Sequence, residues 1–202
     1  MRRFFSRAWL AAAVALASTA INAANYDETL LGDLSGVPAT PTTWNLAAGA
    51  NVLKGSAGTS SDYDIFSLTI PAGHRLDSLT LDAYQNQGYA SFLGIQAGTT
   101  WTAGLGWSVD GNALLGYDLF DIGFVGTNRL PDIALNGNTI GPQFTPPLGS
   151  GTYTMLLQDT GSTYGYQFTF NVSAVPEPAT LGLAAVGLIG IARFARRADR
   201  VQ

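Results

Sequence analysis

Alternation of apolar and polar side chains is the feature that most constrains how this chain can fold. It is clearest in YGYQFTFNV, residues 164–172, where aromatic side chains and Val172 face one way and polar side chains the other. A period of two residues with aromatic and β-branched side chains on one face is typical of a half-buried antiparallel strand. Shorter stripes of the same kind occur at residues 66–70, 79–83, 120–124 and 153–157.

Turn-forming sequences separate these stripes. They are PAGH at residues 71–74, NQG at 86–88, DGN at 110–112 and NGN at 136–138, and the Pro-rich GPQFTPPLG at 141–149 predicts a loop. No helical pattern of comparable length lies between residues 25 and 174. We therefore predict an all-β fold, an antiparallel jelly-roll-like β-sandwich over residues 25–174, flanked by an N-terminal signal-peptide helix and a C-terminal apolar helix.

The first 24 residues have the order of a cleaved secretion signal. Three arginines among the first seven residues precede an apolar stretch at residues 8–17, and small residues follow as far as Ala24. The apolar stretch has the length of a signal-peptide core and is too short to span a bilayer. We therefore predict a signal peptide at residues 1–24, used by the general secretion machinery and removed by signal peptidase. A retained anchor or a buried helix is the alternative.

The body between residues 25 and 174 is acidic. It holds three basic residues against twelve acidic ones, a formal net charge of −9, whereas the full chain has −4. Such a surface repels nucleic acid, so we expect no nucleic-acid partner. Cysteine is absent and His74 is the one histidine, which excludes thiol catalysis, thiolate metal sites and multi-histidine zinc sites. We expect no cofactor.

The C-terminus, residues 175–202, combines three features in a fixed order: a proline-flanked glutamate, an uncharged apolar segment and a cluster of arginines. The residues are Pro176, Glu177 and Pro178, then 179–192, then Arg193, Arg196 and Arg197. Positive charge beside an apolar segment stays on the cytoplasmic side, which places the body outside. The apolar segment is shorter than the about 20 residues of a stable span, which favours a temporary stop in the membrane. A permanent inner-membrane anchor is the alternative.

This order of features resembles the PEP-CTERM sorting signal of Gram-negative bacteria. The resemblance implies that Pro176, Glu177 and Pro178 are recognised by exosortase, a membrane-embedded cysteine transpeptidase-like enzyme. It also implies export across the inner membrane, transient anchoring by a short C-terminal transmembrane helix, and a final location at the cell surface or outside the cell. Proteins with this signal are typically linked to exopolysaccharide and biofilm production.

Four segments of the body carry a second resemblance. They are YDETLLGDLSG at residues 26–36, GANVLKGSAG at 49–58, DYDIFSLTIPAG at 62–73 and GTYTMLLQDTG at 151–161. Together they resemble the bacterial pre-peptidase C-terminal domain, a small jelly-roll-like β-sandwich attached to secreted proteases and surface proteins. The resemblance implies a non-catalytic accessory or binding module. Some relatives bind polysaccharide or protein matrix, and a few hold calcium.

Two pairs of residues in the body are candidate binding sites. Asp62 and Asp64 lie two apart at the start of a predicted strand, so they point the same way and are suited to share Ca²⁺; the alternative is that they cap a turn. Trp101 and Trp107 lie in a glycine-rich polar segment and are candidates for stacking on a sugar ring; the alternative is that both fill the core.

No catalytic residue is predicted. Asp118 and Asp121 are the pair that a glycosidase would need, but at this spacing on a strand they face opposite sides. The leading hypothesis is therefore an exported, non-enzymatic surface or matrix protein, sorted by an exosortase-type system and associated with exopolysaccharide or biofilm. The alternatives are an extracellular glycan hydrolase and a binding module anchored permanently in the inner membrane.

Overall fold

The computed structural model describes residues 23–58, 62–85, 90–136, 143–159 and 161–176. The expected signal-peptide helix lies outside these residues, and so do the apolar C-terminal helix and the arginine cluster. Within the described ranges, strands dominate and the helices are short. No helix in this part of the chain combines the length and the hydropathy that crossing a bilayer requires. The predicted all-β fold is confirmed.

Eight strands and five short helical segments occur in the described residues. The strands are β1 (Tyr26–Asp27), β2 (Thr42–Asn45), β3 (Gly49–Ala57), β4 (Asp64–Gln85), β5 (Ser91–Ala97), β6 (Gly116–Phe120), β7 (Leu148–Gln158) and β8 (Tyr164–Ala174). The helices are α1 (Glu28–Leu31) and α2 (Leu130–Leu135), and the 3₁₀ turns are η1 (Gly106–Ser108), η2 (Gly111–Ala113) and η3 (Ile122–Phe124).

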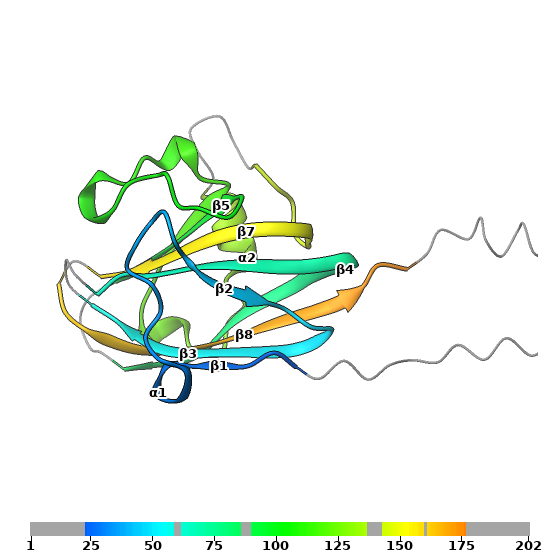
Figure 1. The fold of residues 1–202 in the computed structure, drawn as a ribbon, viewed down its shortest axis with the longest axis horizontal. Helices are drawn as coiled ribbons and strands as arrows, with labels where there is room; N and C mark the ends of the chain where they lie inside the picture. Colours follow the sequence, from blue (N-terminus) through cyan, green and yellow to red (C-terminus); the bar gives the residue numbers. More distant parts are fainter. Residues whose placement is uncertain (1–22, 59–61, 86–89, 137–142, 160, 177–202) are drawn as a thin grey trace, which may run out of the picture.

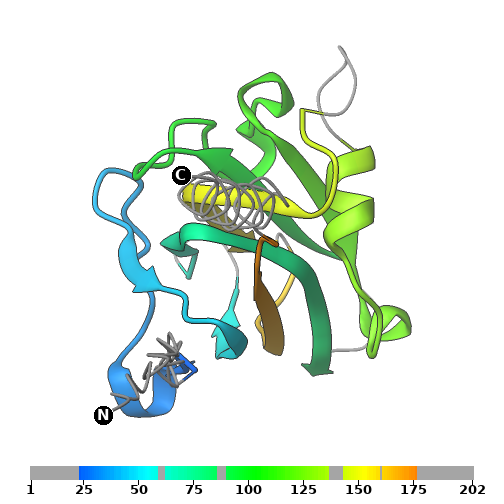
Figure 2. The same cartoon turned by 90° about the vertical axis from the view of Figure 1, so that its right-hand side faces the viewer.

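Strand β4 forms the corner of the architecture. Its first arm, residues 64–70, pairs with β7, and its second arm, residues 74–85, pairs with β8. The strand order β1-β3-β8-β4-β7-β5-β6 therefore passes through both arms, and the sheet folds over into two facing layers (Figure 1). Figure 2 shows β4 curving from one layer to the other.

The corner coincides with the PAGH sequence, which was expected to end one strand before the next began. The strand continues instead, with a register shift between Ile70 and Arg75. Gly73 has a φ of 72°, a conformation that side chains with a Cβ rarely adopt. Proline and glycine therefore mark a bend within a strand here rather than a hairpin turn.

The sheet is mixed rather than wholly antiparallel. β1 pairs in parallel with β3, and β2 pairs in parallel with β4, whereas β3–β8, β4–β7, β4–β8, β5–β6 and β5–β7 are antiparallel. Parallel pairing needs a crossover connection. Each parallel pair has one, because β2 lies between β1 and β3 in the chain and β3 lies between β2 and β4.

Aromatic rings fill the space between the two layers. Phe66 of the first β4 arm meets Phe170 of β8 edge to face, with ring centroids 6.4 Å apart, and Trp44 of β2 lies 5.0 Å from Phe170. Such contacts between facing strands add about 0.5–1.5 kcal/mol each to the free energy of burying the rings. The buried face of β8 is the predicted one: Tyr164, Tyr166, Phe168, Phe170 and Val172.

The outer face of the β4–β7 pair is covered as well. Ile65 and Leu156 form a second apolar cluster there with Trp101 and Leu114, which come from the connection between β5 and β6. Where β4 and β7 pair, they are therefore buried on both faces. This explains why apolar and polar side chains no longer alternate there.

The predicted stripe at residues 120–124 is wrong beyond its first residue. β6 ends at Phe120, and the Asp121 side chain accepts a hydrogen bond from Gly123 N at 2.7 Å, which begins η3. Ile122 and Phe124 consequently leave the strand and are exposed to solvent. An aspartate that caps a turn interrupts the strand although the apolar period continues.

Candidate functional site

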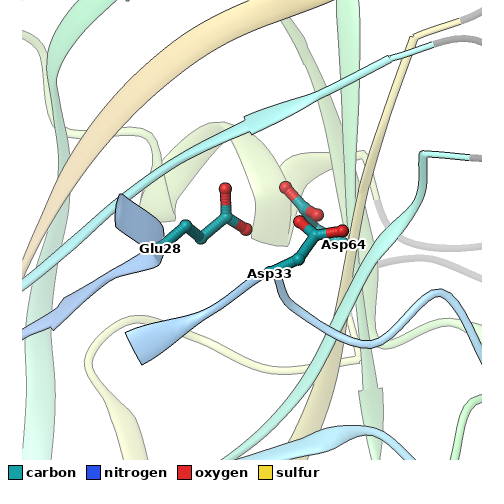
Figure 3. Close-up of side chains that lie close together, drawn as sticks. All are labelled: Glu28, Asp33 and Asp64. Atoms are coloured by element: carbon teal, nitrogen blue, oxygen red, sulfur yellow. The ribbon is translucent and has the colours of Figure 1, made fainter. Parts of the chain in front are cut away.

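Three carboxylates converge where the N-terminal segment meets β4 (Figure 3). Glu28 begins α1, Asp33 follows that helix, and Asp64 begins β4. One carboxylate oxygen from each lies within 4.8 Å of the other two, and the three carboxyl groups point toward one another. Asp64 is buried, Glu28 is half-buried and Asp33 is exposed. Among the described residues, this group is suited to hold a metal ion.

Backbone hydrogen bonds fix the position of the Glu28 carboxylate. Its Oε1 accepts from Leu34 N at 3.2 Å, and its Oε2 accepts from Ser56 N on β3 at 2.8 Å. A Cβ at Gly55 would lie 2.5 Å from Glu28 Cδ, so glycine at that position leaves the room that the carboxylate occupies. The preceding Asp27 caps α1 by accepting from Thr29 N and forms an ion pair with Lys54.

Asp64 is buried with half of its carboxylate unpartnered. Its Oδ2 accepts a hydrogen bond from the Tyr166 hydroxyl at 2.7 Å, whereas its Oδ1 has no partner among the described residues. Burial, reinforced by the charge of Glu28, raises the pKa of the Asp64 carboxyl to about 9, although the Tyr166 hydrogen bond acts in the opposite direction. Burial likewise raises the pKa of Glu28. The site therefore favours a bound cation or a retained proton.

The predicted Asp62 and Asp64 pair is only partly brought together with this group. Asp62 lies near enough that its charge contributes to the raised pKa of Asp64, but it is outside the group of three. Glu28 and Asp33 were missed because they lie far from Asp64 in the sequence and no ligand spacing joins them. The available signal was the concentration of acidic residues in YDETLLGD, at residues 26–33.

A second feature is a surface groove of about 280 Å³ beside η1. Its lining includes Ala90, Phe92, Trp107, Val109, Leu119 and Asp159. The Trp107 side chain is 91% exposed. The neighbouring Gly106 is held by Gln158, whose Oε1 accepts from Gly106 N at 2.9 Å and whose Nε2 donates to Gly106 O at 3.1 Å. The backbone that presents the exposed indole is thus fixed by a buried side chain.

Trp101, the other candidate for sugar stacking, lies in the second apolar cluster. It is 3% exposed, and its Nε1 donates to Gly104 O. A Cβ at Gly94 of β5 would lie 2.9 Å from the Trp101 ring, so the ring fills the space that this glycine leaves. The ring of Trp101 is therefore covered, and Trp107 is the member of the predicted pair that faces solvent.

Asp118 and Asp121, the two aspartates considered for a glycosidase, are engaged in contacts that support the fold. Asp118 is buried on β6, and Arg129 Nε donates to its Oδ2 at 2.6 Å. Arg129 also lies over the Phe124 ring at 4.1 Å and forms an ion pair with Asp132. Asp121 caps η3. Neither lines the groove beside Trp107.

The described residues reach the start of the sorting signal. Val175 N donates a hydrogen bond to Gly73 O at the corner of β4 at 2.7 Å, and Pro176 is exposed. The other predicted residues of the signal, Glu177, Pro178, Arg193, Arg196 and Arg197, lie outside the described residues.

Comparison with known proteins identifies the C-terminal signal. A family model described as the PEP-CTERM protein-sorting motif matches residues 174–197, which include the proline-flanked glutamate and the arginines Arg193, Arg196 and Arg197. Searches of curated proteins and of solved structures found no match to the chain. The resemblance of the body to the pre-peptidase C-terminal domain therefore stays a prediction. The chain carries a PEP-CTERM sorting motif, and this motif marks it as an extracellular protein targeted by an exosortase.

Proposed function

We propose that this protein is an exported, non-enzymatic β-sandwich that exosortase processing delivers to the cell surface or matrix, where it associates with exopolysaccharide. The PEP-CTERM match at residues 174–197 is the observation on which the proposed delivery to the cell surface rests. Transient anchoring by the apolar segment and passage through the general secretion machinery, with removal of residues 1–24 by signal peptidase, belong to the same proposal.

The groove beside Trp107 supports a glycan as the ligand. An exposed indole offers a flat apolar surface to the apolar face of a sugar ring, and Leu119 and Val109 extend that surface. Because Gln158 fixes Gly106, little backbone freedom is lost when a ligand binds. The formal charge of −9 on residues 25–174 favours a neutral or cationic polysaccharide over a polyanionic one.

The contacts of the carboxylates support binding without turnover. A glycosidase needs two carboxyl groups flanking one bond. Among the described residues that line the groove, Asp159 is the one carboxylate, and it is buried and accepts hydrogen bonds from Ser91 Oγ at 3.2 Å and Gly161 N at 2.6 Å. A glycan hydrolase that uses Asp159 is the second candidate function, because this carboxylate lines the same groove as an exposed tryptophan.

The delivery is tested by the intact mass of the protein recovered outside cells that contain the exosortase, compared with cells that lack it. We expect released protein that begins near Asn25 and ends near the Pro-Glu-Pro sequence. In cells without the exosortase, the arginine cluster should remain and the protein should stay with the membrane. Released material that extends to Gln202 would reject exosortase processing, and an arginine cluster retained in both strains would favour a permanent anchor.

The ligand is tested by affinity electrophoresis of the full chain, purified in mild detergent, in gels that contain exopolysaccharide from the producing cells. Trp107→Ala should raise the dissociation constant for the polysaccharide about fivefold or more, in keeping with about 1–3 kcal/mol for a ring stacked on an aromatic side chain. Trp107→Phe should retain part of the affinity for the polysaccharide. Leu30→Ala, which removes another exposed apolar side chain, is the matched control and should leave the affinity unchanged. Release of reducing ends that disappears in Asp159→Asn would favour the hydrolase.

A further inference from the structure

The carboxylate group formed by Glu28, Asp33 and Asp64 is not used by the proposed glycan groove. It brings three acidic side chains from two distant parts of the chain within 4.8 Å. Carboxylates this close repel one another unless a proton or a cation lies between them. None of the ion pairs among the described residues includes any of the three, because Lys54, which comes from the neighbouring β3, pairs with Asp27 instead. The negative charge of the group is therefore uncompensated by the described side chains.

An independent observation points to a ligand between these carboxylates. Asp64 has an exposed fraction of 0%, yet its Oδ1 has no hydrogen-bond partner among the residues that the structure describes, and its carboxyl group faces Glu28 and Asp33 (Figure 3). Buried polar atoms in native proteins are nearly always partnered, and one that is not calls for an unseen water or ion. The Tyr166 hydroxyl occupies the other oxygen and fixes the orientation of the carboxylate.

The surrounding backbone fixes the Glu28 carboxylate and leaves its oxygens able to bind an ion. Each Glu28 oxygen accepts one backbone N–H, and a carboxylate oxygen has a second lone pair available. A side chain at position 55 would collide with the Glu28 carboxylate and with the Tyr166 hydroxyl, so Gly55 keeps the space open. Asp33 is exposed, which leaves the site accessible from solvent.

We infer that Glu28, Asp33 and Asp64 bind one Ca²⁺ ion, which ties the segment from β1 to Asp33 to the start of β4. The donors are all oxygen, which suits calcium and magnesium and disfavours zinc or copper, whose protein sites rely on nitrogen and sulfur. Calcium fits better than magnesium, because one helix residue, one loop residue and one strand residue make an irregular set with room for waters. Magnesium requires near-ideal octahedral geometry.

The test is calorimetric titration of the full chain, purified in mild detergent and freed of metal with EDTA, with CaCl₂ and separately with MgCl₂. We expect one Ca²⁺ per chain with a dissociation constant on the order of 10⁻⁴–10⁻³ M, as in extracellular modules, and Mg²⁺ binding about tenfold weaker or more. Calcium should also raise the unfolding temperature, since an ion that binds the folded state stabilises it. No uptake of Ca²⁺ at millimolar concentration overturns the inference.

Variants locate the ion. Asp33→Asn changes an exposed ligand and should fold normally, and Asp64→Asn replaces the buried ligand with a side chain of the same shape. Each should weaken Ca²⁺ binding about tenfold or more and remove the calcium-dependent rise in unfolding temperature. Asp77→Asn, a change in a surface carboxylate near the corner of β4 that pairs with Arg75, should bind like the wild type. Unchanged affinity in folded Asp33→Asn overturns the inference even if Asp64→Asn fails to fold.

Discussion

The Tyr166 hydroxyl donates a hydrogen bond of 2.7 Å to Oδ2 of Asp64, which joins β8 to the first residue of β4. Both residues are buried. Because Oδ1 of Asp64 has no partner among the described residues, the Tyr166 hydroxyl is the one described donor to the Asp64 carboxyl group.

Replacement of Tyr166 by phenylalanine should destabilise the fold. The change leaves both Asp64 oxygens without a partner, which costs about 1–3 kcal/mol in the free energy of unfolding. Urea unfolding followed by circular dichroism measures it. Tyr153→Phe is the control, because the Tyr153 hydroxyl donates to Gly149 O in an exposed position and its loss should cost less than about 1 kcal/mol. Equal losses in the two variants would contradict the role assigned to Tyr166.

Stability in EDTA should fall as the pH rises. The pKa of Asp64 is about 9 in the folded protein against an ordinary value of 3.8, so between these values the folded state binds more protons than the unfolded state. The free energy of unfolding therefore decreases with pH in this window, by at most about 1.4 kcal/mol per pH unit for one proton. Glu28, whose pKa is also raised, contributes in the same direction. Tyr166, Asp62 and Asp33 are the other titratable groups that affect the pKa of Asp64.

Urea unfolding in EDTA at about pH 5 and about pH 8 measures this dependence. Asp64→Asn should reduce the slope and raise stability at the higher pH, whereas Asp77→Asn should keep the wild-type slope. If the free energy of unfolding changes with pH to the same extent in the wild type and in Asp64→Asn, another group is responsible for the pH dependence.

The buried ion pair between Arg129 and Asp118 should be sensitive to loss of one partner. Arg129→Ala leaves the Asp118 carboxylate buried and unpaired, and we expect a loss of about 3–5 kcal/mol in the free energy of unfolding. Arg75→Ala is the matched control, since it breaks a partly exposed surface pair with Asp77 and should cost less than about 1 kcal/mol. Chemical unfolding of both variants measures these losses. A small loss of stability in Arg129→Ala would mean that solvent reaches the Asp118 carboxylate.

The two tryptophans should differ sharply in their contribution to stability. Trp101→Ala opens a cavity in the second apolar cluster and should cost about 3–5 kcal/mol, while Trp107→Ala should change stability by less than about 0.5 kcal/mol. Thermal and urea unfolding give the comparison. Collisional quenching of tryptophan fluorescence by acrylamide should decrease in Trp107→Ala, and undiminished quenching would place that indole in the interior.

Strands that are covered on one face could be predicted from the sequence. β8 is the clearest case, because only one of its faces packs in the core and its alternation is complete. The corner of β4 could not be predicted, since proline and glycine mark a hairpin turn and a bend within a strand in the same way. The end of β6 was hidden for another reason: the apolar period continues past Phe120, and the cap formed by Asp121 is a local hydrogen bond that periodicity does not detect.

The candidate sites were predicted to different extents. The sorting signal lies within one continuous stretch of sequence, so its order could be recognised directly. Asp64 was identified without Glu28 and Asp33, because their proximity depends on how β1 and α1 pack against β3. Trp101 and Trp107 lie in the same glycine-rich segment, and only the packing of that segment over β5 and β7 separates a buried indole from an exposed one.

If the apolar segment enters the membrane as proposed, the hydrogen bond from Val175 N to Gly73 O at the corner of β4 limits how far the domain can lie from the bilayer. β8 ends at Ala174 and the apolar segment begins at residue 179, so the two are five residue steps apart, a distance of at most about 18 Å even in a fully extended chain. In that case the domain would lie close to the surface of the bilayer. Under the same proposal, an enzyme that cuts at the prolines has to reach them between the bilayer and the corner of β4. We therefore expect a bulky insertion at that corner to block the cut without altering the motif.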